Sequence, residues 1–196
     1  MKFKQIKKIL QTKNIGIAGC GGLGSNCAVA LARVGLGKLI IADFDVVEKS
    51  NLNRQYYFFD QIGGKKVIAL KDNIKKINPE VNVHALDIKL NPENLIKIFN
   101  SCDIIIEAFD LAEMKQMIIE TVLLEMPGKP IISGLGVAGW GDNNLIKTRQ
   151  VGDLYICGDE KTETSEKMPP LAPKVGIVAN MQANLALEII LSRRKK

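Results

Sequence analysis

The sequence is poor in the residues that bind metals. It has one histidine and four cysteines, and the cysteines form no CxxC pair. A structural zinc site takes several such ligands in closely spaced pairs, so zinc is not expected. Cys20, Cys27, Cys102 and Cys157 are instead predicted to be reduced structural thiols, as suits the cytoplasm.

Long apolar runs are missing as well. No stretch reaches the roughly 18 apolar residues of a membrane helix. Residues 1–8 interleave lysines with single apolar side chains and so lack the continuous apolar segment of a signal peptide. We therefore expect no membrane association and a cytoplasmic location.

Aromatic residues make up only 5% of the chain, whereas hydrophobic residues as a whole make up 46%. At 196 residues the chain is long enough for one well-buried α/β domain, so we expect one domain over 1–196 with its core at 14–190. The formal net charge is +6, with a basic tail at 193–196. Because no aromatic stacking pattern accompanies the lysines, nucleic-acid binding is not expected.

Short apolar segments alternate with segments of helical periodicity along most of the chain. The predicted strands are 15–18, 39–43, 81–86, 103–108 and 130–133, and the predicted helices are 22–34, 65–77, 92–99, 111–124 and 175–191. Strands this apolar cannot leave a face in water. The pattern therefore predicts an α/β fold with a Rossmann-like, open, mainly parallel sheet and helices on both faces.

The pattern changes after the fifth predicted strand. Residues 139–144 are rich in glycine and polar residues, and the segments on either side favour an added C-terminal antiparallel hairpin ending near 154–156. Residues 158–170 are polar and end in prolines, so we expect a mobile loop. Trp140 is either a core side chain or part of a partner-binding surface.

A glycine-rich turn follows the first predicted strand. The run from Gly19 to Gly24 ends this strand and opens a helix, where backbone N–H groups can approach a phosphate. Asp43 ends the next strand, at the spacing of an acid that binds a ribose hydroxyl. We predict that Gly19, Gly21, Gly22 and Gly24 contact phosphate through their backbone and that Asp43 binds ribose.

A polar cluster follows the second strand, where an open parallel sheet has its ligand crevice. Its members are Asn51, Asn53, Arg54 and Gln55. Arg54 can hold phosphate oxygens through two parallel hydrogen bonds, and the alternative is a surface salt bridge. Asp45, just before this cluster, is either a supporting group of the site or a turn former.

Two more features point to the same crevice. Lys65 and Lys66 open a helix, where the positive end of the helix dipole disfavours cations unless an anion lies nearby. Asp110 follows the fourth strand. Its carboxylate either binds Mg²⁺ together with a triphosphate or caps the helix that follows.

These motifs resemble the ThiF/MoeB family of adenylyltransferases, which activate ubiquitin-like sulfur carriers. The resemblance covers residues 14–190, and the length is most similar to the short ThiF-type members that act on the thiamine carrier ThiS. The matching elements are the glycine run, Asp43-Phe44-Asp45, Asn51-Leu52-Asn53-Arg54-Gln55, Gly63-Gly64-Lys65-Lys66-Val67, Asp110 and Pro173-Lys174-Val175-Gly176.

The resemblance implies an ATP site and a reaction. In that reaction the C-terminal glycine carboxylate of a Gly-Gly carrier attacks the α-phosphate of ATP, giving an acyl-adenylate and pyrophosphate. The implied roles are Asp43 on ribose, Asn51 and Arg54 on the triphosphate, Lys66 on phosphate and Asp110 on Mg²⁺. Arg54, Lys66 and Asp110 are the expected catalytic residues, Asp45 and Gln55 complete the nucleotide site, and a homodimer is implied.

Three departures from the family pattern limit the transfer. The CxxC zinc pairs of larger members are missing, no arginine precedes Arg33, and residues 158–170 contain no cysteine. We therefore expect adenylation without a thioester or acyl-persulfide on this chain. Three other functions stay open: activation of a tRNA-borne carboxylate by the same chemistry, NAD-dependent oxidation or reduction, and ATP binding without catalysis.

Overall fold

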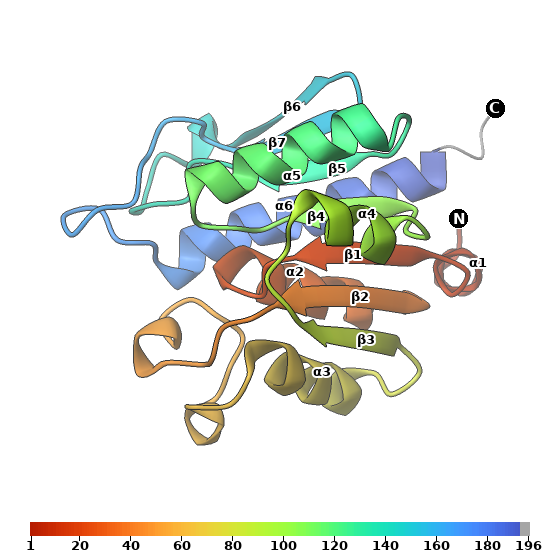
Figure 1. The fold of residues 1–196 in the computed structure, drawn as a ribbon, viewed down its shortest axis with the longest axis horizontal. Coiled ribbons are helices and arrows are strands. Elements are labelled where there is room, and N and C mark those ends of the chain that lie inside the picture. The colour runs from red at the N-terminus through yellow and green to blue at the C-terminus, as the bar shows by residue number, and fades with distance from the viewer. Residues whose placement is uncertain (193–196) are drawn as a thin grey trace.

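The computed structural model describes residues 1–192, so the basic tail at 193–196 lies outside the described residues. Its strands are β1 (Asn14–Ala18), β2 (Lys38–Asp43), β3 (Asn82–Asp87), β4 (Ile104–Glu107), β5 (Ile131–Gly134), β6 (Lys147–Val151) and β7 (Leu154–Gly158). They form one sheet in the order β3-β2-β1-β4-β5-β7-β6 (Figure 1). Every neighbouring pair is parallel except β6 and β7. The Rossmann-like, mainly parallel sheet is confirmed.

Helices cover both faces of this sheet, as predicted. They are α1 (Phe3–Leu10), α2 (Gly22–Arg33), α3 (Lys66–Ile77), α4 (Pro92–Phe99), α5 (Ala112–Glu125) and α6 (Ala172–Ser192). One apolar core lies under α1, α2, α3 and α6, and a second lies under α4 and α5. Side chains of β1 alternate between the two, because successive strand residues point to opposite faces.

The carboxyl ends of the parallel strands share one edge of the sheet. The glycine-rich turn after β1, the irregular segment between β2 and α3, and the turn after β4 all lie at this edge (Figure 1). The first described residue and the end of α6 lie toward the opposite edge. The topology thus gathers the predicted site residues on one side of the molecule, where open parallel sheets bind ligands.

The C-terminal hairpin is present, but its predicted turn is wrong. Residues 139–144 do not join its strands; the turn is Gly152-Asp153, between β6 and β7. Gly152 has a φ of +59°, a conformation that hairpin turns of this length require and that glycine adopts without strain. The glycine-rich segment at 139–144 was the stronger turn signal in the sequence, and it forms a loop before β6 instead.

Two helices differ from the sequence-based expectations. No helix was predicted at α1, in which Lys4 and Lys8 are exposed while Ile9 and Leu10 are buried. The last helix, α6, begins at Ala172 and is long and apolar enough, by length and composition alone, to cross a membrane. The sequence has no uninterrupted apolar stretch in this segment, because polar residues such as Gln182 lie within it. Gln182 is buried in the structure. Half of that stretch is buried inside the structure, and α6 packs on α2 as a core helix.

Candidate nucleotide-binding site

Two glycines of the turn after β1 are required by close packing. Gly19 has a φ of +94°, and a Cβ there would lie 2.7 Å from the Ala108 carbonyl oxygen, just past β4. A Cβ at Gly24 would collide with the carbonyl oxygen of Gly19. These glycines let α2 start directly against the ends of β1 and β4, which fixes the direction of the helix N-terminus.

The outer side of the same turn is open. Gly21 is the N-cap of α2 and supplies no side-chain cap, so the first N–H groups of the helix are available to an anion. A Cβ at Gly21 would have one neighbour within 4 Å, the side-chain nitrogen of Gln55 at 3.8 Å. The open side of the helix N-terminus therefore faces the predicted polar cluster.

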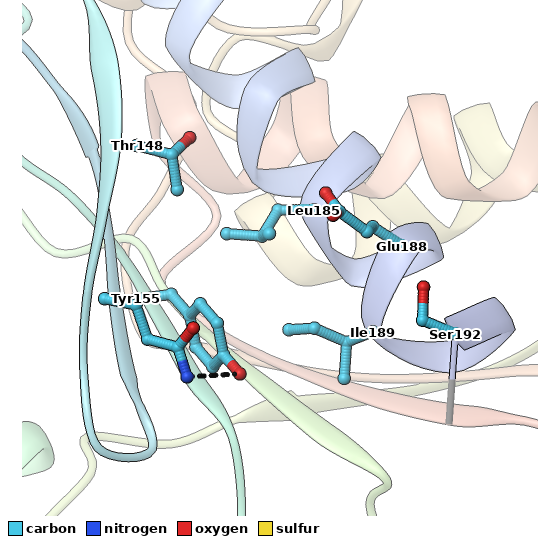
Figure 2. A pocket seen from close by; sticks show the side chains of 7 residues that line it. Thr148, Tyr155, Leu185, Glu188, Ile189 and Ser192 are labelled. Carbon is cyan, nitrogen blue, oxygen red and sulfur yellow. Dashed lines mark hydrogen bonds between the residues drawn. The ribbon is translucent and has the colours of Figure 1, made fainter. Parts of the chain in front are cut away.

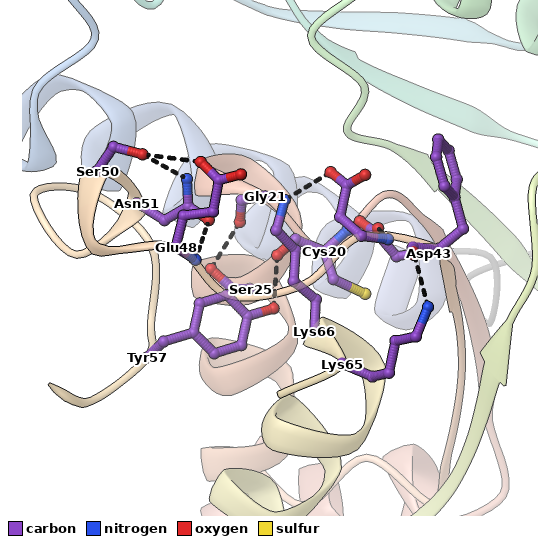
Figure 3. A network of polar contacts seen from close by, with 12 residues as sticks. Cys20, Gly21, Ser25, Asp43, Glu48, Ser50, Asn51, Tyr57, Lys65 and Lys66 are labelled. Carbon is purple, nitrogen blue, oxygen red and sulfur yellow. Dashed lines mark hydrogen bonds and ion pairs between the residues drawn. The ribbon is translucent and has the colours of Figure 1, made fainter. Parts of the chain in front are cut away.

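Asp43 lies against the glycine turn. Its carboxylate accepts hydrogen bonds from the N–H of Cys20 (2.6 Å) and from the N–H of Asp45 (2.8 Å; Figure 3). Burial raises the pKa of Asp43, and the two backbone hydrogen bonds and Lys66 oppose that rise. The acid at the end of β2 thus sits beside the helix N-terminus, in the place predicted for a ribose ligand.

Lysines at the start of α3 were expected to need a nearby anion, and a carboxylate of the chain itself supplies it. Lys66 is 6% exposed, and its ammonium pairs with the Asp45 carboxylate at 2.7 Å. Asp45 is thereby a supporting group that holds Lys66, whereas Lys65 bonds to the Phe44 carbonyl oxygen and pairs with Asp87. Because the buried ammonium has one exposed carboxylate as its partner, it keeps donors for a phosphate oxygen.

Arg54 bonds to neutral groups. Its guanidinium donates to the Ser50 carbonyl oxygen at 3.1 Å and to the Asn53 side-chain oxygen at 2.8 Å. Within residues 1–192 no carboxylate lies at ion-pair distance from it, so the surface salt bridge considered from the sequence does not form. The aliphatic part of Arg54 lies 3.6 Å from the position of a Cβ on Gly22. Its positive charge is thus uncompensated beside the helix N-terminus.

Asn51 and Gln55 are buried parts of the same cluster. The Asn51 side-chain oxygen accepts the N–H of Glu48 at 3.0 Å, which closes the short helical turn before Arg54. The side-chain oxygen of Gln55 is buried and has no hydrogen-bond partner among the described residues. A buried acceptor without a donor costs free energy, so a ligand that donates a hydrogen bond there would be stabilised.

Three residues of this network were missed from the sequence. The Tyr57 hydroxyl donates to the Cys20 carbonyl oxygen at 2.7 Å, and burial raises its pKa, so it stays protonated. Ser25 donates to the Gly21 carbonyl oxygen (Figure 3) and also accepts the N–H of Tyr56. Asn26 donates to the Arg54 carbonyl oxygen at 2.9 Å. Ser25 and Asn26 were visible as polar residues in an apolar helix; nothing local marked Tyr57.

Asp110 is exposed at the turn between β4 and α5. The N-cap of α5 is Leu111, and no side-chain cap hydrogen bond is made there, so the capping alternative does not hold. No three His, Cys, Asp or Glu residues gather as a metal site within residues 1–192. A single exposed carboxylate suits Mg²⁺ that is held mainly by phosphate oxygens and water, as is usual at nucleotide sites.

The four cysteines are free and buried. Burial raises the pKa of Cys102 to about 12 and also raises the pKa of Cys20, Cys27 and Cys157. Since the thiolate is the reactive form, these side chains are poor nucleophiles.

A separate hollow of about 480 Å³ lies between the hairpin and the second half of α6 (Figure 2). Its lining includes Thr148, Tyr155, Leu185, Glu188 and Ile189. None of the predicted site residues lines it. The candidate site is therefore the polar cluster around Asp43, Arg54 and Lys66 at the carboxyl edge of the sheet.

A buried ion pair anchors the start of segment 158–170. Lys174, in the first turn of α6, pairs with Asp159 at 2.7 Å and donates to the Ala138 carbonyl oxygen at 2.8 Å. Asp159 also accepts from Thr162. Burial alone raises the pKa of Asp159, but the hydrogen bonds from Lys174, Thr162 and the N–H of Lys161 lower it to about 2. The mobility of the rest of this segment stays a prediction.

Replacing Asp159 by Asn is expected to destabilise the fold by about 3–5 kcal/mol, because Lys174 would be left as a buried, unpaired charge. Asp159→Asn combined with Lys174→Met should recover most of that loss.

The stability of the fold should also depend on pH through Asp159. The folded-state pKa of about 2 lies below the usual value near 3.9, so the carboxylate stabilises the fold at higher pH and this contribution disappears as pH falls from about 4 to about 2. Urea unfolding of wild type, the single variant and the double variant from pH 6 to pH 3 measures both effects. Equal pH slopes in wild type and the double variant would contradict the assignment.

Comparison with known proteins agrees with the geometry. The family model described as ThiF family matches residues 2–196. The chain is 33% identical over 185 residues to adenylyltransferase and sulfurtransferase MOCS3 of Xenopus laevis, covering 92% of this chain and 40% of that protein. It is 29% identical over 189 residues to adenylyltransferase and sulfurtransferase UBA4 of Candida glabrata, covering 93% and 43%. The chain spans about two fifths of the length of these curated relatives.

Solved structures share the fold. The E. coli tRNA N6-threonylcarbamoyladenosine dehydratase TcdA, crystallised with AMP, superposes with a TM-score of 0.89 at 20% identity and covers 98% of this chain and 91% of that one. The sheet order, the glycine turn and the acid of β2 define a Rossmann-like protein with a candidate nucleotide site. More specifically, the chain belongs to the ThiF family.

Proposed function

We propose that this chain is an ATP-dependent adenylyltransferase that activates the C-terminal glycine carboxylate of a ubiquitin-like sulfur carrier. The observation that carries the proposal is the pairing of an uncapped helix N-terminus at Gly21 with the uncompensated guanidinium of Arg54. Such a site suits a polyanion. Membership of the ThiF family, and the adenylyltransferase names of the curated relatives, support ATP over a nicotinamide cofactor.

In this reaction the enzyme mainly positions two anions and neutralises charge on the triphosphate. The carrier carboxylate is already ionised at pH 7 and needs no general base. Arg54 and Lys66 would hold phosphate oxygens, and Asp43 would orient the ribose. Mg²⁺, held by Asp110 and the phosphates, would supply further positive charge. The buried, protonated cysteines support adenylation without a covalent thiol intermediate.

The finer assignment is to a thiamine-type carrier, in the cytoplasm and as a homodimer. Trp140 is 70% exposed, which argues against a core role and leaves it accessible to a partner. The second candidate is activation of a carboxylate on modified tRNA. It is favoured by the match to TcdA, because that solved chain is covered over 91% of its length, whereas the curated relatives are covered over about two fifths.

ATP–pyrophosphate exchange with Mg²⁺ tests the proposal directly. Exchange should require a purified carrier that ends in Gly-Gly, and it should fall strongly in Asp110→Ala. Replacing the carrier by one that lacks its final glycine is the matched control. Exchange that needs tRNA instead of the carrier would favour the second candidate, and ATP binding without exchange under either condition would contradict both.

A further inference from the structure

A buried glutamate lies at the end of β4, outside the residues assigned to the site. Glu107 is 0% exposed, and both of its carboxylate oxygens contact Lys115 of α5, at 3.0 and 2.9 Å. One oxygen also accepts the N–H of Phe109 at 2.7 Å, and the other accepts the hydroxyl of Ser133. Lys115 donates in addition to the Gly134 carbonyl oxygen at 2.9 Å. This cluster ties together the carboxyl ends of β4 and β5 and the first turn of α5.

The cluster is fully satisfied and electrically neutral. Lys115 has three donors, and its three contacts are the two oxygens of Glu107 and the carbonyl oxygen of Gly134. A buried ion pair of this kind seldom adds stability over an apolar pair of the same size. The ion pair instead fixes the positions of the groups around it, because each donor in the cluster is bonded to a defined acceptor.

The geometry that it fixes is the turn leading to Asp110. The hydrogen bond that the N–H of Phe109 donates to the Glu107 carboxylate fixes the backbone immediately before Asp110. In the same turn, the Ala108 carbonyl oxygen packs against Gly19, so this turn and the glycine loop rest on each other. A shift of the turn would therefore move the Asp110 carboxylate relative to the helix N-terminus.

We propose that Glu107 is a positioning residue for Mg²⁺-ATP: through the N–H of Phe109 it holds Asp110 where the carboxylate can reach a metal bound to the triphosphate. The inference rests on the proposed function, since it takes the nucleotide site as given. Lys115 contacts both oxygens of Glu107 and fixes the orientation of its carboxylate, and Ser133 and Gly134 fix the pair to the sheet.

Two double variants separate positioning from stability. Glu107→Gln with Lys115→Met removes the ion pair but keeps an oxygen that can accept the N–H of Phe109. Glu107→Leu with Lys115→Met removes the ion pair and the acceptor. We expect the Gln variant to bind Mg²⁺-ATP within about threefold of wild type and the Leu variant to bind it about tenfold more weakly, the effect of one lost hydrogen bond to an essential turn.

Calorimetric titration with ATP, in Mg²⁺ and in EDTA, reads out the difference. In EDTA both variants should match wild type within about threefold, and in an Asp110→Asn background the Leu substitution should add no further loss in Mg²⁺. Equal weakening with and without the metal, or losses that multiply with Asp110→Asn, would overturn the proposal. If the Leu variant lacks cooperative unfolding, Glu107→Asp replaces it, because it keeps the charge and withdraws the acceptor.

The titration needs no carrier, so the two proposals fail separately. A wild-type protein that performs carrier-dependent exchange, together with variants that show no metal-specific loss, would overturn the role of Glu107 alone. A wild-type protein that binds no ATP would contradict both.

Discussion

Arg54→Ala is expected to lower carrier-dependent ATP–pyrophosphate exchange about 100-fold to 1,000-fold, the usual cost of removing one preorganised donor to developing charge. The guanidinium has only neutral partners among the described residues, so its charge is available to the triphosphate. Its aliphatic part also lies beside Gly22 at the start of α2. Initial exchange rates at saturating Mg²⁺ measure the loss.

Arg33→Ala is the matched control. Arg33 is an exposed arginine at the last turn of α2, and its guanidinium reaches the Tyr56 hydroxyl at 3.4 Å. Removing the Arg33 side chain should leave the exchange rate unchanged. Neither Arg33→Ala nor Arg54→Ala should lower the unfolding midpoint appreciably, because surface changes usually alter stability by less than about 0.5 kcal/mol. Arg54→Lys should restore little activity, since a lysine cannot make the paired, planar contacts of a guanidinium. Equal exchange rates in the two alanine variants would show that Arg54 has no part in the reaction.

The backbone of the candidate site could be predicted from the sequence because its signals are local. Gly19 and Gly24 stand where α2 must approach the ends of β1 and β4, and Asp43 ends a strand of clear apolar pattern. Parallel topology then brings these segments to one edge. The family resemblance drawn from these motifs is confirmed by the family match over residues 2–196.

Side-chain pairing could not be predicted in the same way. Asp45 and Lys66 form their ion pair across 21 positions, and the Tyr57 hydroxyl reaches Cys20 across 37. Such contacts depend on how the segment between β2 and α3 folds back over the glycine turn, and no periodicity encodes that. The misplaced hairpin has a related cause. Both 139–144 and Gly152-Asp153 carry turn residues, and only the pairing of β7 with β5 decides between them.

Gly21→Ala should separate nucleotide binding from folding. A Cβ at Gly21 meets nothing closer than the Gln55 side-chain nitrogen at 3.8 Å, and its φ of −75° lies outside the left-handed region that favours glycine. Stability should therefore change by less than about 1 kcal/mol. The new methyl group would stand where a phosphate must approach the helix N-terminus. We expect ATP affinity to fall about tenfold to 100-fold, the cost of one or two hydrogen bonds to a charged group.

Gly24→Ala provides the contrast, because its Cβ would collide with the carbonyl oxygen of Gly19 inside the turn. Backbone cannot move aside cheaply there, so overpacking should cost about 1–3 kcal/mol of stability or more. Thermal unfolding and ATP titration should be measured for both variants. Gly21→Ala should keep its stability and lose ATP affinity, whereas Gly24→Ala should lose stability. If Gly21→Ala kept full ATP affinity, the phosphates would have to bind elsewhere than at the N-terminus of α2, and the proposed site would be wrong at its centre.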